Sequence, residues 1–506
     1  MSLSAPPARP SPVTARLAAD RLGVPAVLFF VLSAATPLTV VAGVITTGYA
    51  ATGLIGIPLA FLLVGLVLGL FSIGYVSMAR HVANPGGFYS YVAQGVGRPF
   101  GVGAAWVALL AYNALQVGLY GAIGAATGPL LDQWFGVASP WWTIALVAWP
   151  VTAVLGVRRV DLNGHVLAVL LLAEVAIIMV YNLGSLTHPA DGRYSYEALT
   201  PDNLFGPGVG AILVLAVLGF VGFEAAVVFS EESRDPRRTV RTATYLSVVV
   251  IAVLYALSAW AMTVAAGGDR IVDVSRTEGT EVVFNQASAH LGQTLADLGH
   301  ALFATSIVAA MISFHNTTAR YMFALGRERV LPASLGRAAR TSGAPRTASL
   351  CQSAIGLTVI IAYAITGADP VIHLFYWAGT SGGLGVLFLI ATTSIAVLAF
   401  FGRYPHDERL WRRLIAPSAA AIALAVVAVL AIGNVATLLG IPDDHPLAWA
   451  VPTGYLGAAV AGIAWGLVLR RIRPDVYATI GLGARSASAL YGPAHRHAVP
   501  RTQVSR

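Results

Sequence analysis

Two glycines and a carboxylate, Gly219, Gly222 and Glu224, stand close together inside an apolar stretch. Glycine in a helix interior costs about 1 kcal/mol relative to alanine, so two glycines three residues apart weaken a helix here. A bilayer tolerates non-helical backbone only where protein or a water-filled cavity satisfies its polar groups. We therefore expect a broken helix whose backbone, from Gly219 to Phe223, binds a small molecule that carries both a carboxylate and an ammonium group. A simple kink in a packed helix is the alternative.

A second interruption is expected in the first long apolar segment, because Pro37 lies in its middle. Proline lacks an amide hydrogen and clashes with the backbone one turn earlier, so it breaks or kinks a helix. Interrupted segments at matching positions in two halves of a chain are typical of transporters built from an inverted repeat, whose site lies between the breaks. The second part of the predicted substrate site is therefore the backbone before the proline: Ser33, Ala34, Ala35 and Thr36.

Only two carboxylates, those of Glu174 and Glu224, lie deep inside apolar segments. A charge at the bilayer centre costs about 2.5–3.5 kcal/mol on insertion scales, so such residues are functional candidates. Glu174 has no charged neighbour in the sequence, and apolar surroundings disfavour its charged form, which makes it a candidate for proton binding. Glu224 stands where the second half of its helix would begin. There it either caps free amides or recognises a substrate ammonium.

Other side chains near the breaks extend the predicted site. Tyr112 and Gln116 lie one helical turn apart in the third apolar segment and are expected to contact substrate. Phe220 and Phe223 either wall the pocket or pack in the core. The histidines are scattered without the spacing of metal ligands, so we predict neither a metal site nor a cofactor.

The loop after the second break carries Glu231, Glu232 and Asp235 among several arginines. We expect these charges to form a solvated cluster.

The composition is that of a membrane protein. Of the 506 residues, 57% are hydrophobic and 11% are charged, whereas a soluble domain carries about 25% charged residues. All 31 basic residues are arginine and follow the predicted loops, so the net charge of +8 does not indicate a nucleic-acid partner. The single cysteine, Cys351, excludes an intrachain disulfide. No nucleotide-binding motif is present, so ATP is not expected to drive the protein directly.

A membrane-spanning helix needs about 20 apolar residues. The sequence contains twelve candidate segments, at residues 24–50, 54–79, 99–131, 141–157, 163–186, 207–231, 242–266, 293–325, 348–367, 371–401, 415–438 and 447–469. The loops and tails on one side hold 28 of the 31 arginines. Because cytoplasmic loops are enriched in basic residues, both termini are predicted to be cytoplasmic, in a multi-pass protein of the cell membrane. Residues 1–22 are expected to form a tail and not a cleaved signal.

Three stretches resemble the amino acid–polyamine–organocation permease superfamily, over roughly residues 24–400. They are Gly219–Glu224 with the following Asp235–Val240, the Asn84–Tyr91 loop, and Ala319–Arg327 with Val330–Pro332. One departure lies in the first break, where Ser-Ala-Ala-Thr-Pro stands in place of the Gly-x-Gly of many relatives.

The resemblance implies an all-α membrane protein of twelve helices with the leucine-transporter-type fold. Its transport core would be residues 23–401, in which two inverted sets of five helices, at about 23–186 and 207–401, have broken first members. Helices 11 and 12 would follow at 402–470, and a cytoplasmic tail at 471–506.

The resemblance also implies a secondary transporter for amino acids or related amines, working by alternating access and either coupled to protons or exchanging. In the superfamily, helix 5 faces helices 1 and 8 at an ion site. This suggests Glu174 as the coupling group, Ser313 on helix 8 as its neighbour, and Glu224 as the next candidate. A structural role for Glu174 stays open, as do a polyamine or organocation antiporter and a non-transporting sensor of the same fold. No catalytic constellation indicates an enzyme.

Overall fold

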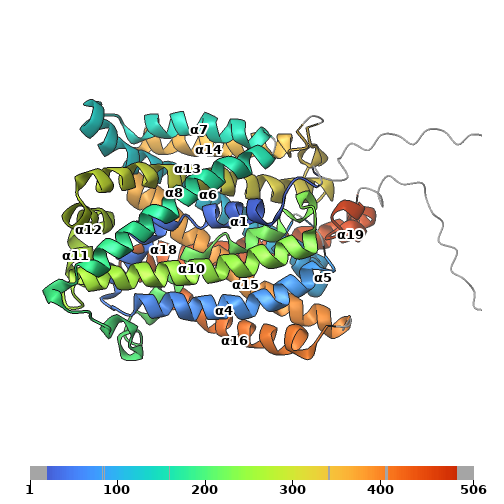
Figure 1. Ribbon diagram of the computed structural model, residues 1–506. Helices are drawn as coiled ribbons and strands as arrows, with labels where there is room; N and C mark the ends of the chain where they lie inside the picture. The colour runs from blue at the N-terminus through green and yellow to red at the C-terminus, as the bar shows by residue number, and fades with distance from the viewer. Residues whose placement is uncertain are drawn as a thin grey trace, which may run out of the picture.

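The structure, a computed structural model, describes residues 17, 20–82, 84, 86–158, 160–339, 342–404 and 408–486. Across these residues it is a bundle of long helices, with a single strand-like bridge between Leu22 and Ser233. Figure 1 shows that the long helices run between two ends. We call the end at α5 (Phe88–Gly95) and α19 (Pro474–Thr479) the terminal end, and the end at α11 (Ile271–Glu278) and α12 (Val282–Leu291) the distal end.

The first half of the bundle contains α1 (Val24–Ala34), α2 (Pro37–Thr39), η1 (Val40–Ile45), α3 (Thr46–Thr52), α4 (Ile57–Ala79), α5, α6 (Arg98–Phe135), α7 (Trp141–Val157) and α8 (Val160–Thr187). Short helical turns follow at η2 (Ala190–Gly192), η3 (Glu197–Leu199) and η4 (Pro201–Asn203). The second half contains α9 (Val209–Phe220), η5 (Phe223–Val227), η6 (Ser230–Glu232), α10 (Pro236–Ala266), α11, η7 (Gly279–Glu281), α12, α13 (Gln293–Arg327), η8 (Ala333–Gly336), α14 (Arg346–Thr366), η9 (Pro370–Tyr376) and α15 (Trp377–Arg403). The chain ends with η10 (Trp411–Ile415), α16 (Ala416–Gly433), α17 (Val435–Leu439), α18 (Leu447–Ile472) and α19.

Each of the twelve predicted apolar segments forms helix. Eleven helices in the described part of the chain are long and apolar enough to cross a bilayer, and α7 is a shorter apolar helix of 17 residues. Many side chains on the outside of the bundle are large and apolar, among them Leu66, Val169 and Val429, each more than 60% exposed. Such a surface suits lipid and not water. The chain is therefore a multi-pass membrane protein, while the division into two inverted sets of five stays a prediction.

Both predicted helix interruptions occur. The first follows α1, where Thr36 is in the left-handed region with φ of 44°, and Pro37 starts the next helix without needing an amide partner. The second follows α9, where the chain turns at Val221 and Gly222 before η5 begins. Gly222 has φ of 115°, a conformation that suits glycine and strains other residues.

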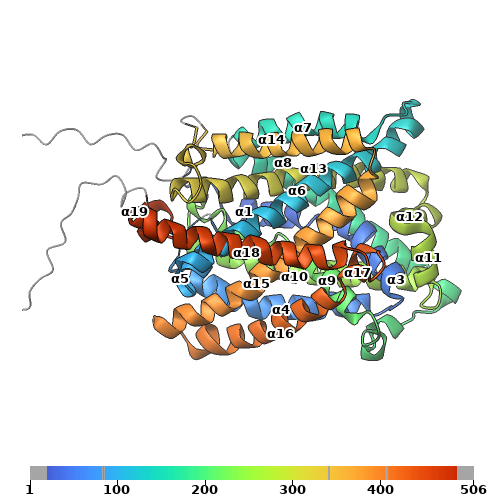
Figure 2. The same cartoon turned by 180° about the vertical axis from the view of Figure 1, so that it is seen from behind.

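The two helices at the end of the chain pack on the outside of the bundle. Figure 2 shows α18 crossing beside α6, while α16 lies along α4 and α15. Neither helix supplies a residue to the lining of the cavity between the two breaks.

Candidate functional site

The two helix breaks meet midway along the bundle. A Cβ built on Gly222 would lie 2.6 Å from the Cβ of Ala34, so only glycine allows the second break to approach the first so closely. The hydroxyl of Tyr255 on α10 donates to the Ala35 carbonyl at 2.9 Å and holds the first break in place. The two breaks therefore pack directly against each other, and neither is merely a local kink in its own helix.

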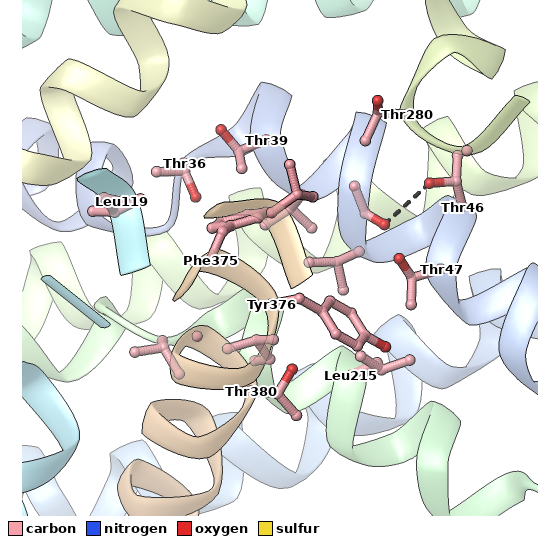
Figure 3. A pocket seen from close by; sticks show the side chains of 18 of the residues that line it. Thr36, Thr39, Thr46, Thr47, Leu119, Leu215, Thr280, Phe375, Tyr376 and Thr380 are labelled. Atoms are coloured by element: carbon pink, nitrogen blue, oxygen red, sulfur yellow. Dashed lines mark hydrogen bonds between the residues drawn. The ribbon is translucent and has the colours of Figure 1, made fainter. Parts of the chain in front are cut away.

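A cavity of about 520 Å³ extends from this junction to the distal end. Both breaks line its inner part, through Ala34, Ala35, Thr36 and Val221. Exposed residues of the distal end, Arg276 and Thr280, line its mouth. Figure 3 shows Thr36 and Thr39 on one side of the cavity, with Phe375 and Tyr376 projecting from the opposite segment. A small solute from the distal side can thus reach the helix breaks.

Toward the terminal end, the path beyond the breaks is filled. The rings of Phe30 on α1 and Phe229, just before η6, stack with their centroids 4.6 Å apart, and both side chains are buried. The guanidinium of Arg320 lies over the Phe229 ring at 4.7 Å. The structure is therefore open to the distal end and closed to the terminal end.

The predicted substrate residues divide into two groups. Ala34, Ala35 and Thr36 line the cavity, whereas Ser33 is buried behind them. In the second break, Val221 is the residue at the cavity, and its neighbours turn into the protein. The residues placed behind the cavity wall are Gly219, Phe220, Gly222, Phe223, Tyr112 and Gln116. Phe220 lies near Phe61, and Phe223 meets Phe71 edge to face at 6.0 Å, which is core packing.

Glu224 acts on its own helix break. Its carboxylate accepts hydrogen bonds from the Tyr112 hydroxyl at 2.6 Å and from the Gly222 amide at 2.9 Å. It is buried, and it does not line the cavity. This geometry corresponds to the capping role and gives the carboxylate no direct access to a ligand in the cavity.

Glu174 on α8 contacts the first break from the other side. Its Oε1 accepts from the Leu38 amide at 2.5 Å and from the Ser306 hydroxyl on α13 at 2.7 Å. Ser306 is in turn 3.4 Å from the hydroxyl of Thr39, which lines the cavity. The partner that the sequence suggested, Ser313, instead donates to the Phe30 carbonyl at 3.0 Å. Ser306 precedes it by two helical turns on the same helix face, a spacing that could have indicated it.

A family model described as amino acid permease matches residues 22–458, most of the chain. The chain belongs to the amino acid permease family. It is therefore a permease of the amino acid–polyamine–organocation superfamily, as its broken-helix and loop motifs suggested. Within the described residues, no cluster of three or more histidine, cysteine or acidic side chains could hold a metal ion.

Several amino acid or polyamine transporters are similar to this chain. The chloroplastic cationic amino acid transporter 7 of Arabidopsis thaliana is 26% identical over 71% of this chain and 62% of its own length. The branched-chain amino acid permease BcaP of Lactococcus lactis is 24% identical over 56% of this chain and 63% of its own length. The low-affinity putrescine importer PlaP of Escherichia coli is 22% identical over 55% of this chain and 61% of its own length. The matches thus cover less than two thirds of each of these three relatives.

Two of the loop charges predicted to be solvated, Glu231 and Glu232, are instead buried in the permease, and for them that prediction is wrong. Arg320 donates to both carboxylate oxygens of Glu232, at 2.7 and 2.9 Å, and Arg327 donates to Glu231 at 2.9 Å. All four side chains are less than 5% exposed. The two arginines are seven residues apart on one face of α13, and η6 places the adjacent glutamates beneath that face. Asp235 stays exposed, as do its neighbours Arg234, Arg237 and Arg238, and it caps α10 through the Arg238 amide.

A third buried carboxylate at the terminal end was missed by the sequence analysis. Glu328, directly after α13, is buried and accepts from the amides of Gly481 and Gly483 at 2.6 and 2.8 Å. It also accepts from Asn84 Nδ2 at 2.9 Å and from the Tyr89 hydroxyl. The segment after α19 is thereby fixed to α5 and to the end of α13.

Proposed function

We propose that this permease carries a zwitterionic amino acid across the cell membrane by alternating access, and that its structure is the outward-open state. The observation that supports this most directly is the cavity that begins at the two helix breaks and reaches only the distal end. On this proposal the arginine-rich terminal end faces the cytoplasm, as the positive-inside rule favours. The carrier would be a five-plus-five inverted repeat whose closed and open ends exchange during the cycle.

Substrate binding would use the backbone of the breaks. Helix beginnings present amides to a carboxylate, and helix ends present carbonyls to an ammonium group. α1 ends at Ala34 and a new helix begins at Pro37, while α9 ends at Phe220 and η5 begins at Phe223. A substrate at Ala35 and Val221 would therefore lie between two helix ends and two helix beginnings.

Gly222→Leu tests whether this junction carries substrate. A leucine there requires a strained left-handed backbone and clashes with Ala34, so uptake into proteoliposomes should be lost. Gly136→Leu is the matched control, because Gly136 is also left-handed, with φ of 65°, but has no atom near its added Cβ. The control should transport normally. Wild-type uptake by correctly folded Gly222→Leu protein would refute the broken-helix site.

We infer further that Glu174 is the group that couples transport to protons. Its carboxyl contacts the first break through the Leu38 amide and the cavity wall through Ser306 and Thr39. Gaining or losing a proton there would change the charge beside the break, and so the relative stability of the two orientations of the carrier. Such coupling requires that the proton bind one orientation more tightly than the other.

Glu174→Gln keeps nearly the same volume and an oxygen acceptor while removing the titration. We expect this variant to bind and exchange substrate but to lose accumulation driven by a pH gradient in proteoliposomes. Glu197→Gln, at an exposed site, should retain accumulation. If Glu174→Gln concentrates substrate with the pH dependence of the wild type, Glu174 is a structural hydrogen-bonding group and Glu224 becomes the next candidate.

A polyamine or organocation antiporter is the second candidate function, because the putrescine importer is among the similar proteins. It predicts exchange of diamines in the same proteoliposomes. Binding without any exchange would instead favour a sensor of the same fold.

A further inference from the structure

The cavity is almost devoid of charge. Its lining, which lies wholly within the described residues, contains a single charged side chain, that of Arg276 at the mouth. The polar groups are mostly threonine hydroxyls, and some of these are already used, since Thr46 donates to the Ala42 carbonyl at 2.6 Å. A ligand in this cavity thus meets backbone polar groups at the helix breaks and uncharged side chains elsewhere.

The two carboxylates nearest to the breaks do not supply the missing negative charge. Glu224 lies behind the wall, where Tyr112 and the Gly222 amide each bond one of its two oxygens. Glu174 also lies behind the wall and accepts from the Leu38 amide and from Ser306. Neither residue lines the cavity, so a cationic ligand group would have no carboxylate to pair with.

The wall that surrounds the inner cavity is apolar and comes from four separate elements. Its side chains are Leu115 and Leu119 of α6, Leu218 of α9, Phe314 of α13 and Phe375 of η9. An amino acid whose carboxylate and ammonium groups lie at the breaks must direct its side chain against this wall. Figure 3 shows the side chains of Leu119 and Phe375 close to Thr36 of the first break.

We propose that the substrate is a neutral amino acid with an apolar side chain, and that the cavity discriminates against cationic amino acids and diamines. This inference rests on the proposed function. Apolar burial favours a leucine or phenylalanine side chain. A second ammonium group would instead lose its hydration without gaining a partner, which is costly in an apolar site.

Counterflow in proteoliposomes tests the proposal independently of proton coupling. Full-length protein is reconstituted in vesicles loaded with an equimolar mixture of unlabelled leucine, phenylalanine, alanine, arginine, glutamate and putrescine. Each labelled compound is then added outside in turn. We expect leucine or phenylalanine to enter most rapidly and alanine about tenfold more slowly, because each methylene in an apolar pocket contributes to selectivity. Arginine and putrescine should enter more slowly still.

The outcomes separate the two proposals. Entry of arginine or putrescine at the rate of leucine or faster would overturn the substrate assignment and leave the transport function intact. Absence of counterflow for every compound, with folded protein in the vesicles, would overturn the transport function itself.

A cavity-filling variant locates the side-chain pocket. Gly379 in the first turn of α15 lines the cavity, and a Cβ added there meets no atom within 4 Å. Gly379→Val should therefore fold and occupy part of the pocket, lowering phenylalanine entry about tenfold while leaving alanine entry nearly unchanged. Gly402→Val, in the same helix and equally unobstructed but outside the cavity, should leave both rates unchanged. Equal loss of alanine and phenylalanine in Gly379→Val alone would show that the side chain does not lie here.

Discussion

The terminal end of the bundle contains two buried ion pairs beside the partly exposed Arg80–Glu408 pair, whereas the arginine–aspartate pairs of the distal end are exposed. At the terminal end, the pairs Arg320–Glu232 and Arg327–Glu231 are less than 5% exposed. At the distal end, the pairs Arg270–Asp191 and Arg276–Asp273 are more than half exposed. Exposed pairs are worth about 0–1 kcal/mol, whereas removing one partner of a buried pair costs about 3–5 kcal/mol.

The end whose ion pairs are exposed is also the end that is open to a solute. The end with exposed pairs opens into the cavity, and the end with buried pairs is filled by the Phe30–Phe229 stack. If transport follows the proposed alternating access, the buried pairs would have to separate when the terminal end opens. Hydration of the freed charges would offset part of the cost of separating them.

Among the variants that test this comparison, Arg320→Ala is expected to lower the stability of the protein the most. It leaves the Glu232 carboxylate buried without its partner and removes the guanidinium from the Phe229 ring. We expect the free energy of unfolding in detergent to fall by about 3–5 kcal/mol. Chemical denaturation followed by tryptophan fluorescence measures this loss.

The double variant Arg320→Met with Glu232→Leu sharpens the test. Replacing both charges by apolar groups removes the unpaired carboxylate, so much of the stability should return. If the single variant costs less than about 1 kcal/mol, the pair behaves like a solvated surface pair and the contrast between the ends fails.

Glu328→Gln is expected to have an intermediate effect, confined to the terminal end. The glutamine has only one acceptor oxygen for the amides of Gly481 and Gly483, so a buried N–H loses its partner at a cost of about 1–3 kcal/mol. The segment around α19 should open more often, and trypsin should cleave after Arg485 about tenfold faster or more. Time-resolved gel analysis measures the cleavage.

Glu408→Gln is the control for this variant, because Glu408 pairs with Arg80 at the same end. Cleavage at α19 should keep its wild-type rate. Equal acceleration in both variants would mean that Glu328 does not fix the C-terminal segment specifically.

The sequence predicted the helices well because the bilayer constrains them. A span must be long and apolar, so the twelve segments could be found to within a few residues at most boundaries. The two breaks were predictable for a related reason, since proline and closely spaced glycines disfavour a continuous helix.

The side chains around the site were less predictable, because their direction depends on packing between distant helices. The sequence indicated Gly219 to Phe223 as substrate-binding, but only Val221 of that stretch reaches the cavity. Glu231 and Glu232 lie in a polar loop, and nothing local reveals that the loop turns under α13. Ser306 and Glu174 are 132 residues apart, so their contact follows from the fold alone.

Arg276→Ala is expected to have the smallest effect on stability. It removes an exposed ion pair at the distal end and is compared with Arg320→Ala at the terminal end. The Arg276 side chain is 53% exposed, and it bonds Asp273 at 3.3 Å and the Ala50 carbonyl at 3.1 Å. Water can replace both contacts, so the free energy of unfolding should change by no more than about 1 kcal/mol. The same denaturation assay as for Arg320→Ala measures it, in parallel samples at one salt concentration. A loss as large as that of Arg320→Ala would mean that the open end is held as firmly as the closed one. The difference in ion-pair exposure would then not correspond to a difference in stability between the two ends.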